Sequence, residues 1–584
     1  MFSDRNNFNC LILILLVVFV HLLTLNFYPT NFEGGFGLGA NFFQSENKLD
    51  LYKIYSKSQF NTIAFSLFAS ALRVIIPFIN GDQAIRILSS SSYIFLGFAL
   101  INLNKFTEAF RYSRKLEQNQ LNNFESDLVV GIYHLKNKKP FLAKKYLLRN
   151  YQRKNLDPIQ KLLSILILQL SNLEDLSYRD SIVKLEKIDI RFENIKKIQK
   201  SFLNCYFDKF STSKVFFDLV NDKSANFNRY NFFFANYLNN KNKSLEYDKA
   251  IKVALRKTPR NLLINQLKLD VERGEKLKNI FDCQNNLHVM AELFYLVSNA
   301  LSSQKFYSVS NFYINLAKFL NPDFISYNIL FAENLNFIEN TNEAKKIYNK
   351  LKDYGDIYHW FANKEIANIY INTDRQQEGI KLLRQSFNKL LKPNIYQKLE
   401  FADYLKNNNK HNDAIKLYTQ ILQEIDITHP IYPQVTDGRG ISFEQIGKWD
   451  KAEKDFMNSL KANPNQAYVL NYLAYSWIEK NINFEKSLIM LKKANNLRKN
   501  DPYITDSLGW VFYKLKDFEK AKIHVQKAVR LMPADPIVND HFGDILWMNN
   551  KKIQARYYWN YVLTLKETKD NMRENILKKL VSGP

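Results

Sequence analysis

Glycine and the signatures of catalysis are scarce in this chain of 584 residues. Its 16 glycines are few for this length, which disfavours glycine-rich phosphate loops and folds with many β-turns. The histidines form no HExxH motif and no pair with cysteine at ligand spacing, and no GxSxG occurs. Gly440 begins a stretch with a Gly-Lys pair, but Trp449 stands where a phosphate loop needs Ser or Thr. The sequence therefore predicts a protein that is not an enzyme, with no catalytic residues, no metal site and no cofactor.

Cysteine is also rare, with only Cys10, Cys205 and Cys283 in the chain. The last two are 78 residues apart and no CxxC occurs, so the sequence predicts neither a zinc site nor a disulfide framework. The cysteines do not define the compartment, although their scarcity is compatible with an oxidising one.

Acidic residues are outnumbered, since 82 lysines and arginines face 57 aspartates and glutamates, a net charge of +25. Such a balance is typical either of binding to nucleic acid or anionic surfaces, or of a lysine-rich composition spread over helix faces. No block of five or more basic residues occurs, which favours the second interpretation. A basic solenoid that binds nucleic acid or anionic surfaces stays as an alternative, and it predicts binding that weakens steeply with salt.

Long apolar runs are confined to the start of the chain. Residues 11–25 read LILILLVVFVHLLTL, Arg5 precedes them, and no basic residue follows until Lys48. This asymmetry predicts a membrane segment within residues 1–28, with the amino terminus inside and the rest across the membrane. No small-x-small site follows Leu25, which favours an uncleaved signal anchor over a cleaved signal peptide. The expected location is the inner membrane with the rest on the periplasmic or exterior side; the alternative is a secreted or periplasmic protein.

The next residues are interpreted as a linker and a buried helix. Residues 29–60 include the glycine-rich stretch 34–39, which is typical of a flexible linker. Residues 62–79 are apolar, but Arg73 in the middle and Pro77 near the end favour a buried helix over a membrane-spanning one.

Small residues return at a fixed period near the carboxyl end. Gly509 and Gly543 are 34 residues apart, as are Ala521 and Ala555. Paired helices approach most closely where glycine or alanine replaces a bulky side chain, and larger apolar residues one turn away fill the grooves. One such pair cannot bury its apolar face alone, so the unit must repeat.

This pattern resembles the tetratricopeptide repeat (TPR), a 34-residue helix–turn–helix unit. The resemblance implies an all-α solenoid, and it places Leu508, Gly509 and Phe512 on a first helix and Ala521, Val525 and Ala528 on a second, with Pro533 closing the unit. Together with the apolar start of the chain, it suggests a TPR protein of the bacterial cell-envelope type.

The repeat divides the chain into regions. Gly97 and Gly131, and Ala109 and Ala143, are 34 apart, so residues 61–157 are interpreted as amino-terminal repeats. Residues 158–290 are predicted to be divergent helical repeats, 291–565 a TPR array, and 566–584 a helix that caps its open face. The second-helix small residues of the array are Ser310, Ala344, Gly379, Ala414, Ala452, Ser487, Ala521 and Ala555.

The TPR resemblance implies that first helices line a concave groove for partner segments, through repeat positions 2, 5, 9 and 12. The candidate groove residues are Tyr468, Asn471, Tyr475, Tyr503, Asp506, Trp510, Tyr513, Asp540, Asp544 and Trp547. An acidic and aromatic groove predicts a basic and apolar partner segment. The structural alternatives are that Asp506 and Asp540 stabilise helix dipoles and that the aromatic residues pack between repeats.

The predicted function is a membrane-anchored or exported scaffold that binds proteins or peptide segments in this groove. Besides nucleic-acid binding, a second alternative is a TPR-bearing enzyme, whose catalytic domain would have room only in residues 158–290.

Overall fold

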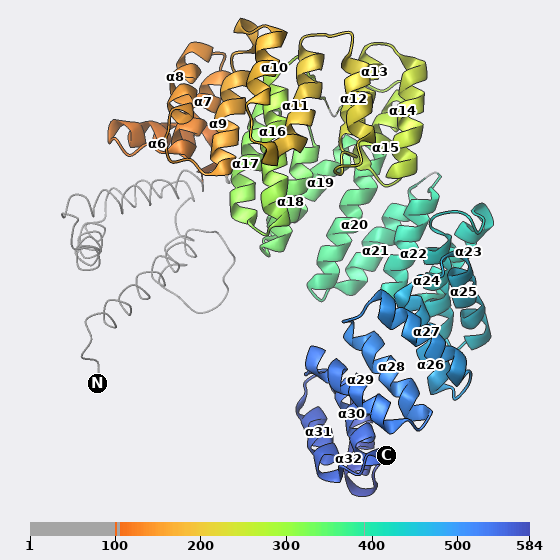
Figure 1. The fold of residues 1–584 in the computed structure, drawn as a ribbon. Helices are drawn as coiled ribbons and strands as arrows, with labels where there is room; N and C mark the ends of the chain where they lie inside the picture. The colour runs from red at the N-terminus through yellow and green to blue at the C-terminus, as the bar shows by residue number, and fades with distance from the viewer. Residues whose placement is uncertain (1–99, 102–104, 279, 391) are drawn as a thin grey trace, which may run out of the picture. The chain divides into compact units, whose positions relative to one another are not determined.

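The computed structural model describes residues 100–101, 105–278, 280–390 and 392–584. The predicted membrane segment, the linker, the second apolar run and Gly97 lie outside these ranges. Within them every regular element is an α-helix or a short 3-10 helix (Figure 1), which agrees with the predicted all-α class. No helix in these ranges has both the length and the apolar character needed to cross a membrane. The chain forms two compact units, a first unit up to Leu382 and a second from Leu383 to Pro584.

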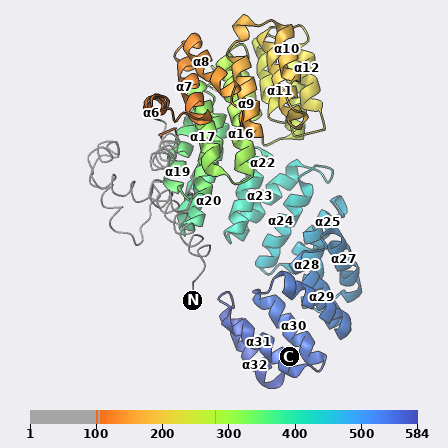
Figure 2. The same cartoon turned by 60° about the vertical axis from the view of Figure 1, so that its left-hand side comes forward.

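The first unit contains helix pairs from two distant parts of the sequence that pack on each other, here called the spine. Helix α16 packs on α9 and α17 on α7, although more than a hundred residues separate each pair along the chain (Figures 1 and 2). The ring of Phe106 stacks on that of Phe319 at 4.2 Å between centroids, and Lys136 Nζ donates to the Leu320 carbonyl oxygen at 3.0 Å. The spine consists of α6 (Phe106–Gln118), α7 (Phe124–Lys136), α8 (Pro140–Tyr151), α9 (Pro158–Leu170), α16 (Asn286–Ser303), α17 (Tyr307–Leu320), α18 (Ser326–Phe337), α19 (Thr341–Leu351), η3 (Lys352–Tyr354) and α20 (Asp356–Asn372).

Between α9 and α16 the chain makes a side branch. The branch comprises η1 (Leu173–Asp175), α10 (Tyr178–Glu186), η2 (Ile190–Phe192), α11 (Glu193–Tyr206), α12 (Thr212–Asn221), α13 (Tyr230–Asn240), α14 (Ser244–Lys257) and α15 (Leu262–Arg273). Its core is rich in phenylalanine, with Phe202, Phe216 and Phe233 buried together.

A disulfide closes the side branch, and the expectation that these cysteines form no disulfide is wrong. Cys205 on α11 is bonded to Cys283, which lies just before α16, with 5.9 Å between their Cα atoms. Their 78-residue separation gave no indication, because the two cysteines meet only in the folded chain.

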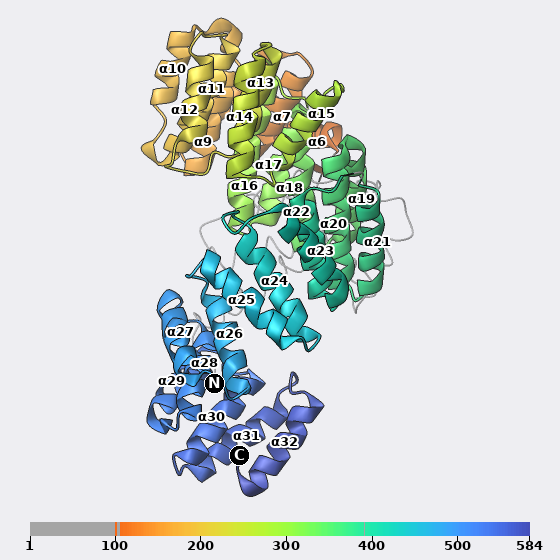
Figure 3. The same ribbon diagram turned by 90° about the vertical axis from the view of Figure 1, so that its right-hand side faces the viewer.

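The second unit is built of successive helix pairs. Helix α21 (Gln376–Asn388) spans the boundary, and the unit continues with α22 (Ile395–Asn407), α23 (His411–Glu424), α24 (Tyr432–Gln445), α25 (Trp449–Ala462), α26 (Ala467–Glu479), α27 (Phe484–Leu497), α28 (Pro502–Lys514), α29 (Phe518–Leu531), α30 (Pro536–Met548), α31 (Lys552–Thr564) and α32 (Asp570–Ser582) (Figure 3).

The small residues of the repeat lie where the paired helices touch. A Cβ atom added at Gly509 would lie 2.3 Å from the Val525 side chain of α29, and one added at Gly543 would lie 2.3 Å from Trp559 Nε1 of α31. The partner residue Ala521 is fully buried. These close approaches are the packing that the 34-residue period predicts.

The starts of α28 and α30 repeat the same local chemistry. Asp501 and Asp535 are the N-caps, each accepting backbone N–H bonds in the first turn, and a proline follows each of them. These two caps define where α28 and α30 begin. Helix α28 packs on both α26 and α30, and the four first helices α24, α26, α28 and α30 are here called the inner layer.

Candidate partner-binding groove

The predicted groove residues lie on the first helices α26, α28 and α30. At position 2, the side chains of Tyr468 and Tyr503 are 52% and 56% exposed, and Ile537 of α30 is 52% exposed. Tyr468 donates its hydroxyl to Asp501 Oδ2 at 3.0 Å. Three successive repeats therefore present a large exposed side chain at the same helical position.

Deeper in the same face, aromatic rings join neighbouring repeats. The indole of Trp510 stacks on Tyr513 at 4.5 Å and on the imidazole of His541 at 3.9 Å. Trp510 Nε1 also donates to Glu479 Oε1 of α26 at 2.8 Å. Trp510 is only 7% exposed, so it belongs mainly to the packing between repeats. This agrees with the alternative interpretation of the aromatic residues, in which they pack rather than bind a partner.

Asp506 has a counter-ion that the sequence analysis did not identify. His541 Nδ1 lies 2.8 Å from Asp506 Oδ2, and both side chains are buried. Burial by itself lowers the pKa of His541, but the carboxylates of Asp506, Asp540 and Asp544 outweigh it, so the pKa is raised. The imidazole thus supplies positive charge to the face predicted to be acidic.

Asp540 and Asp544 share a lysine from the last helix. Lys579 of α32 donates to Asp540 Oδ1 at 2.7 Å and to Asp544 Oδ2 at 2.8 Å. Trp559 Nε1 donates to Asp544 Oδ1 at 3.2 Å. Burial and the neighbouring Asp540 raise the pKa of Asp544 to about 6. The predicted capping helix α32 therefore also places a basic side chain against two of the predicted groove acids.

Helix pairs that nest at small residues 34 to 38 positions apart, each with an inner and an outer helix, define the architecture. A TPR repeat-containing protein of Pseudomonas aeruginosa is 27% identical to this chain over 113 residues. The described helix pairs form a TPR-like solenoid. The match covers 19% of the chain, and the chain spans 18% of the length of that curated relative.

Two solved structures of TPR proteins are similar to parts of the chain. A TPR protein structure from Parabacteroides merdae is 17% identical, and the match covers 38% of this chain and 86% of the other, with a TM-score of 0.32. One from Thermus thermophilus is 15% identical, and the match covers 32% of this chain and 100% of the other, with a TM-score of 0.28. No protein-family model matches the chain.

Two polar oxygens of the TPR face have no hydrogen-bond partner. They are Asn471 Oδ1 and Asp506 Oδ1, both at repeat position 5 and both shielded from solvent. A buried acceptor without a partner costs about 1–3 kcal/mol. Asn539 Oδ1 of α30 also has no partner, so the described first helices of the second unit keep three such buried acceptors.

The last two predicted residues, Tyr475 and Trp547, take part in aromatic packing at partly buried positions. Tyr475 is partly buried, and burial together with nearby Glu479 raises its pKa. Trp547 packs on Trp559 at 5.5 Å and lies under the cations of Lys552 and Arg556. The sequence did not identify His541, Glu479 and Lys579 as residues of this face. Only His541 could have been suspected, because it directly follows the predicted groove residue Asp540.

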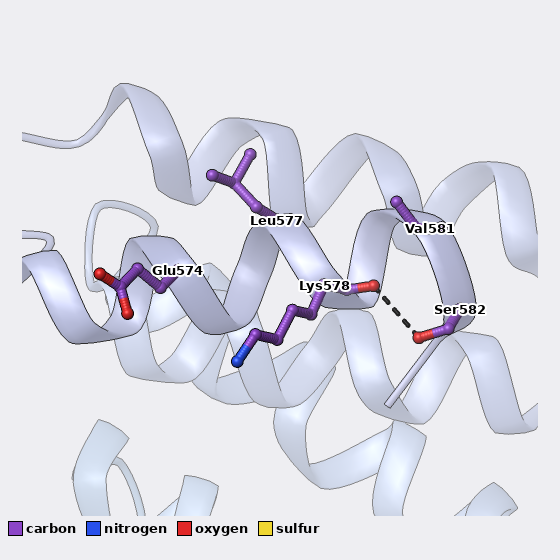
Figure 4. A pocket seen from close by; sticks show the side chains of 5 residues that line it. All are labelled: Glu574, Leu577, Lys578, Val581 and Ser582. Carbon is purple, nitrogen blue, oxygen red and sulfur yellow. Dashed lines mark hydrogen bonds between the residues drawn. The ribbon is translucent and has the colours of Figure 1, made fainter.

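Two other features of the described residues carry no chemistry. A hollow on α32 is lined by Glu574, Leu577, Lys578, Val581 and Ser582, and Figure 4 shows all five along this one helix. Ser582 Oγ donates to the Lys578 carbonyl oxygen at 3.2 Å. No group of three or more metal-ligating side chains occurs in the described ranges.

Replacing His541 by glutamine is expected to lower the unfolding free energy of the second unit by about 1–3 kcal/mol near pH 6 and by less near pH 9. The folded pKa is raised, so the contribution of the charged imidazole is present below the unfolded pKa of about 6.5 and is lost as pH rises through the folded value. Tryptophan fluorescence during urea unfolding measures this, because Trp360 alone of the six tryptophans lies outside the second unit. An equal loss at both pH values would contradict the assignment.

Proposed function

We propose that the inner TPR face of α26, α28 and α30 binds an extended segment of a partner protein, and that the chain acts as a non-enzymatic scaffold. The observation that carries this proposal is the pair of unpartnered oxygens, on Asn471 and Asp506, at equivalent positions of consecutive repeats. A partner backbone N–H or a basic side chain, arriving after a small side-chain movement, would remove the cost of leaving them unpaired.

The chemistry of the proposed partner segment follows from the exposed side chains at position 2 and from the charge of the inner face. Tyr468, Tyr503 and Ile537 offer apolar contact area at low entropic cost. Lys579 already occupies the site between Asp540 and Asp544, which supports recognition of basic groups by this face. The proposed partner segment is therefore apolar with a lysine or arginine.

The proposal includes export of the repeats, with the chain anchored by its apolar residues 11–28 or released after cleavage. The charge asymmetry around that segment supports it. The bond between Cys205 and Cys283 supports it too, since structural disulfides persist outside the reducing cytosol.

Peptide binding by the full chain tests the groove. In a fluorescence-polarisation screen with a peptide library, we expect a preference for apolar, lysine-containing peptides. The double variant Tyr468→Ser/Tyr503→Ser is expected to weaken the best peptide at least about tenfold, because exposed aromatics at an interface carry about 1–2 kcal/mol each.

The matched control is Ile523→Ser, which removes a side chain of comparable exposure, 65%, from the outer helix α29. Its affinity for the peptide is expected to equal that of the parent chain. Equal affinity of the tyrosine double variant and the parent chain would refute the groove.

A further inference from the structure

Charge is segregated between the two helix layers of the second unit. The first helices α24, α26, α28 and α30 hold two lysines and arginines and six carboxylates. The second helices α25, α27, α29 and α31 hold twelve lysines and arginines and five carboxylates. The net positive charge of this array therefore lies on its second helices.

The second helices also form the outer side of the array. Helix α28 buries residues around most of its circumference, whereas α29 buries only Ala521, Val525 and Ala528. The remaining side chains of α29 are exposed or partly exposed. What this layer presents to solvent is thus not determined by the packing of the repeats.

Two outer helices present the same exposed motif, here called the outer patch. Ile489 of α27 and Ile523 of α29 are 34 residues apart and 69% and 65% exposed. A lysine stands one turn before each isoleucine and another one turn after it, and all four are exposed: Lys486, Lys493, Lys520 and Lys527. Side chains three and four residues apart on a helix share a face, so each isoleucine is flanked by two cations.

We propose that the outer patch docks on an anionic lipid surface. Aliphatic side chains inserted among lysines suit the boundary between acyl chains and headgroups, where the apolar group is buried and the ammonium groups meet lipid phosphates. Each lysine near an anionic leaflet adds attraction that salt weakens. This surface is separate from the proposed groove, so the chain can rest on a membrane while its inner face holds a partner.

The make-up of the patch favours lipid over the other anionic partners. Nucleic-acid binding relies on arginine forks and on aromatic rings that stack on bases, whereas the patch has lysine and isoleucine. An acidic peptide would be expected to dock in a groove, while these side chains lie on outward helix faces. An acidic protein and a nucleic acid are therefore the alternative outcomes of the test.

An environment-sensitive fluorophore at the patch tests the proposal in the full chain. The label NBD is attached at Ile523→Cys in a Cys10→Ser background, because Cys205 and Cys283 are bonded to each other. The chain is reconstituted in vesicles of phosphatidylcholine alone, or with about one phosphatidylglycerol in four lipids. We expect a blue shift and at least about a twofold rise in emission with the anionic lipid only, reversed by high salt.

The control label at Tyr503→Cys has similar exposure on the inner layer and is expected not to respond. Replacing all four patch lysines by glutamine is expected to abolish the response at position 523, while circular dichroism stays unchanged. No response at 523, or equal responses at 523 and 503, would overturn the proposal. So would a stronger response to soluble polyglutamate or DNA than to anionic vesicles.

Discussion

The first unit of a full chain carrying Arg229→Met is expected to lose about 3–5 kcal/mol of unfolding free energy. The guanidinium joins the side branch to the spine, donating from Nε and Nη2 to the two carboxylate oxygens of Glu292 at 2.7 and 2.9 Å. Its Nη1 donates to Ser326 Oγ at 2.6 Å. The Glu292 side chain is fully buried, so methionine would leave its charge without a partner in a medium of low polarity.

Hydrogen exchange of the α13 and α16 amides measures this loss locally, without interference from the second unit. The double variant Arg229→Met/Glu292→Leu is expected to recover much of the stability, because both charges are then removed. Arg191→Met is the matched control, since Arg191 pairs with Asp189 on the surface, where water screens the attraction and the pair contributes little to stability. Equal exchange in Arg229→Met and the parent chain would show that the buried pair does not hold the branch.

Removing the disulfide is expected to have a similarly large effect. The double variant Cys205→Ala/Cys283→Ala should lose on the order of 4 kcal/mol in the first unit, since the bond closes a loop of 78 residues and restricts the unfolded chain. The helices α12–α15 lie inside that loop, so their amides are expected to show the greatest increase in exchange.

Thiol titration of the denatured native protein provides an independent check that also bears on export. One reactive thiol, from Cys10, is expected if the chain matures in an oxidising compartment, and three if it stays in a reducing one. The variant Cys10→Ser serves as the control for the count and is expected to leave exchange in the first unit unchanged. Three thiols together with an unaltered double variant would remove the disulfide from the account of stability and of location.

The repeat could be predicted from the sequence because it depends on side-chain size at a fixed interval. Gly509 and Gly543 lie against Val525 and Trp559 as a 34-residue helix pair requires. Such packing is local, since both helices of a pair belong to one short stretch of chain. The return of α16 onto α9 depends on contacts between distant residues, for which the sequence shows no period.

In the groove too, some features could be predicted from the sequence and others depend on contacts between distant residues. The sequence placed Asp506 and Asp540 on first helices, but it did not show that each acid already has a counter-ion within the protein. His541 and Lys579 supply those counter-ions from the next helix and from α32. Their positions depend on how neighbouring helices are rotated, which composition and spacing do not encode.

The order of small and large residues alone determined that this chain forms nested helix pairs with an inner and an outer layer. Tertiary structure decided which polar groups are satisfied within the protein and which, like Asn471 Oδ1, are left without a partner. It also decided that Cys205 reaches Cys283. The physical reason is range: helix pairing acts over one repeat, whereas charge neutralisation and cross-linking depend on which distant side chains the folded chain brings within a few ångströms.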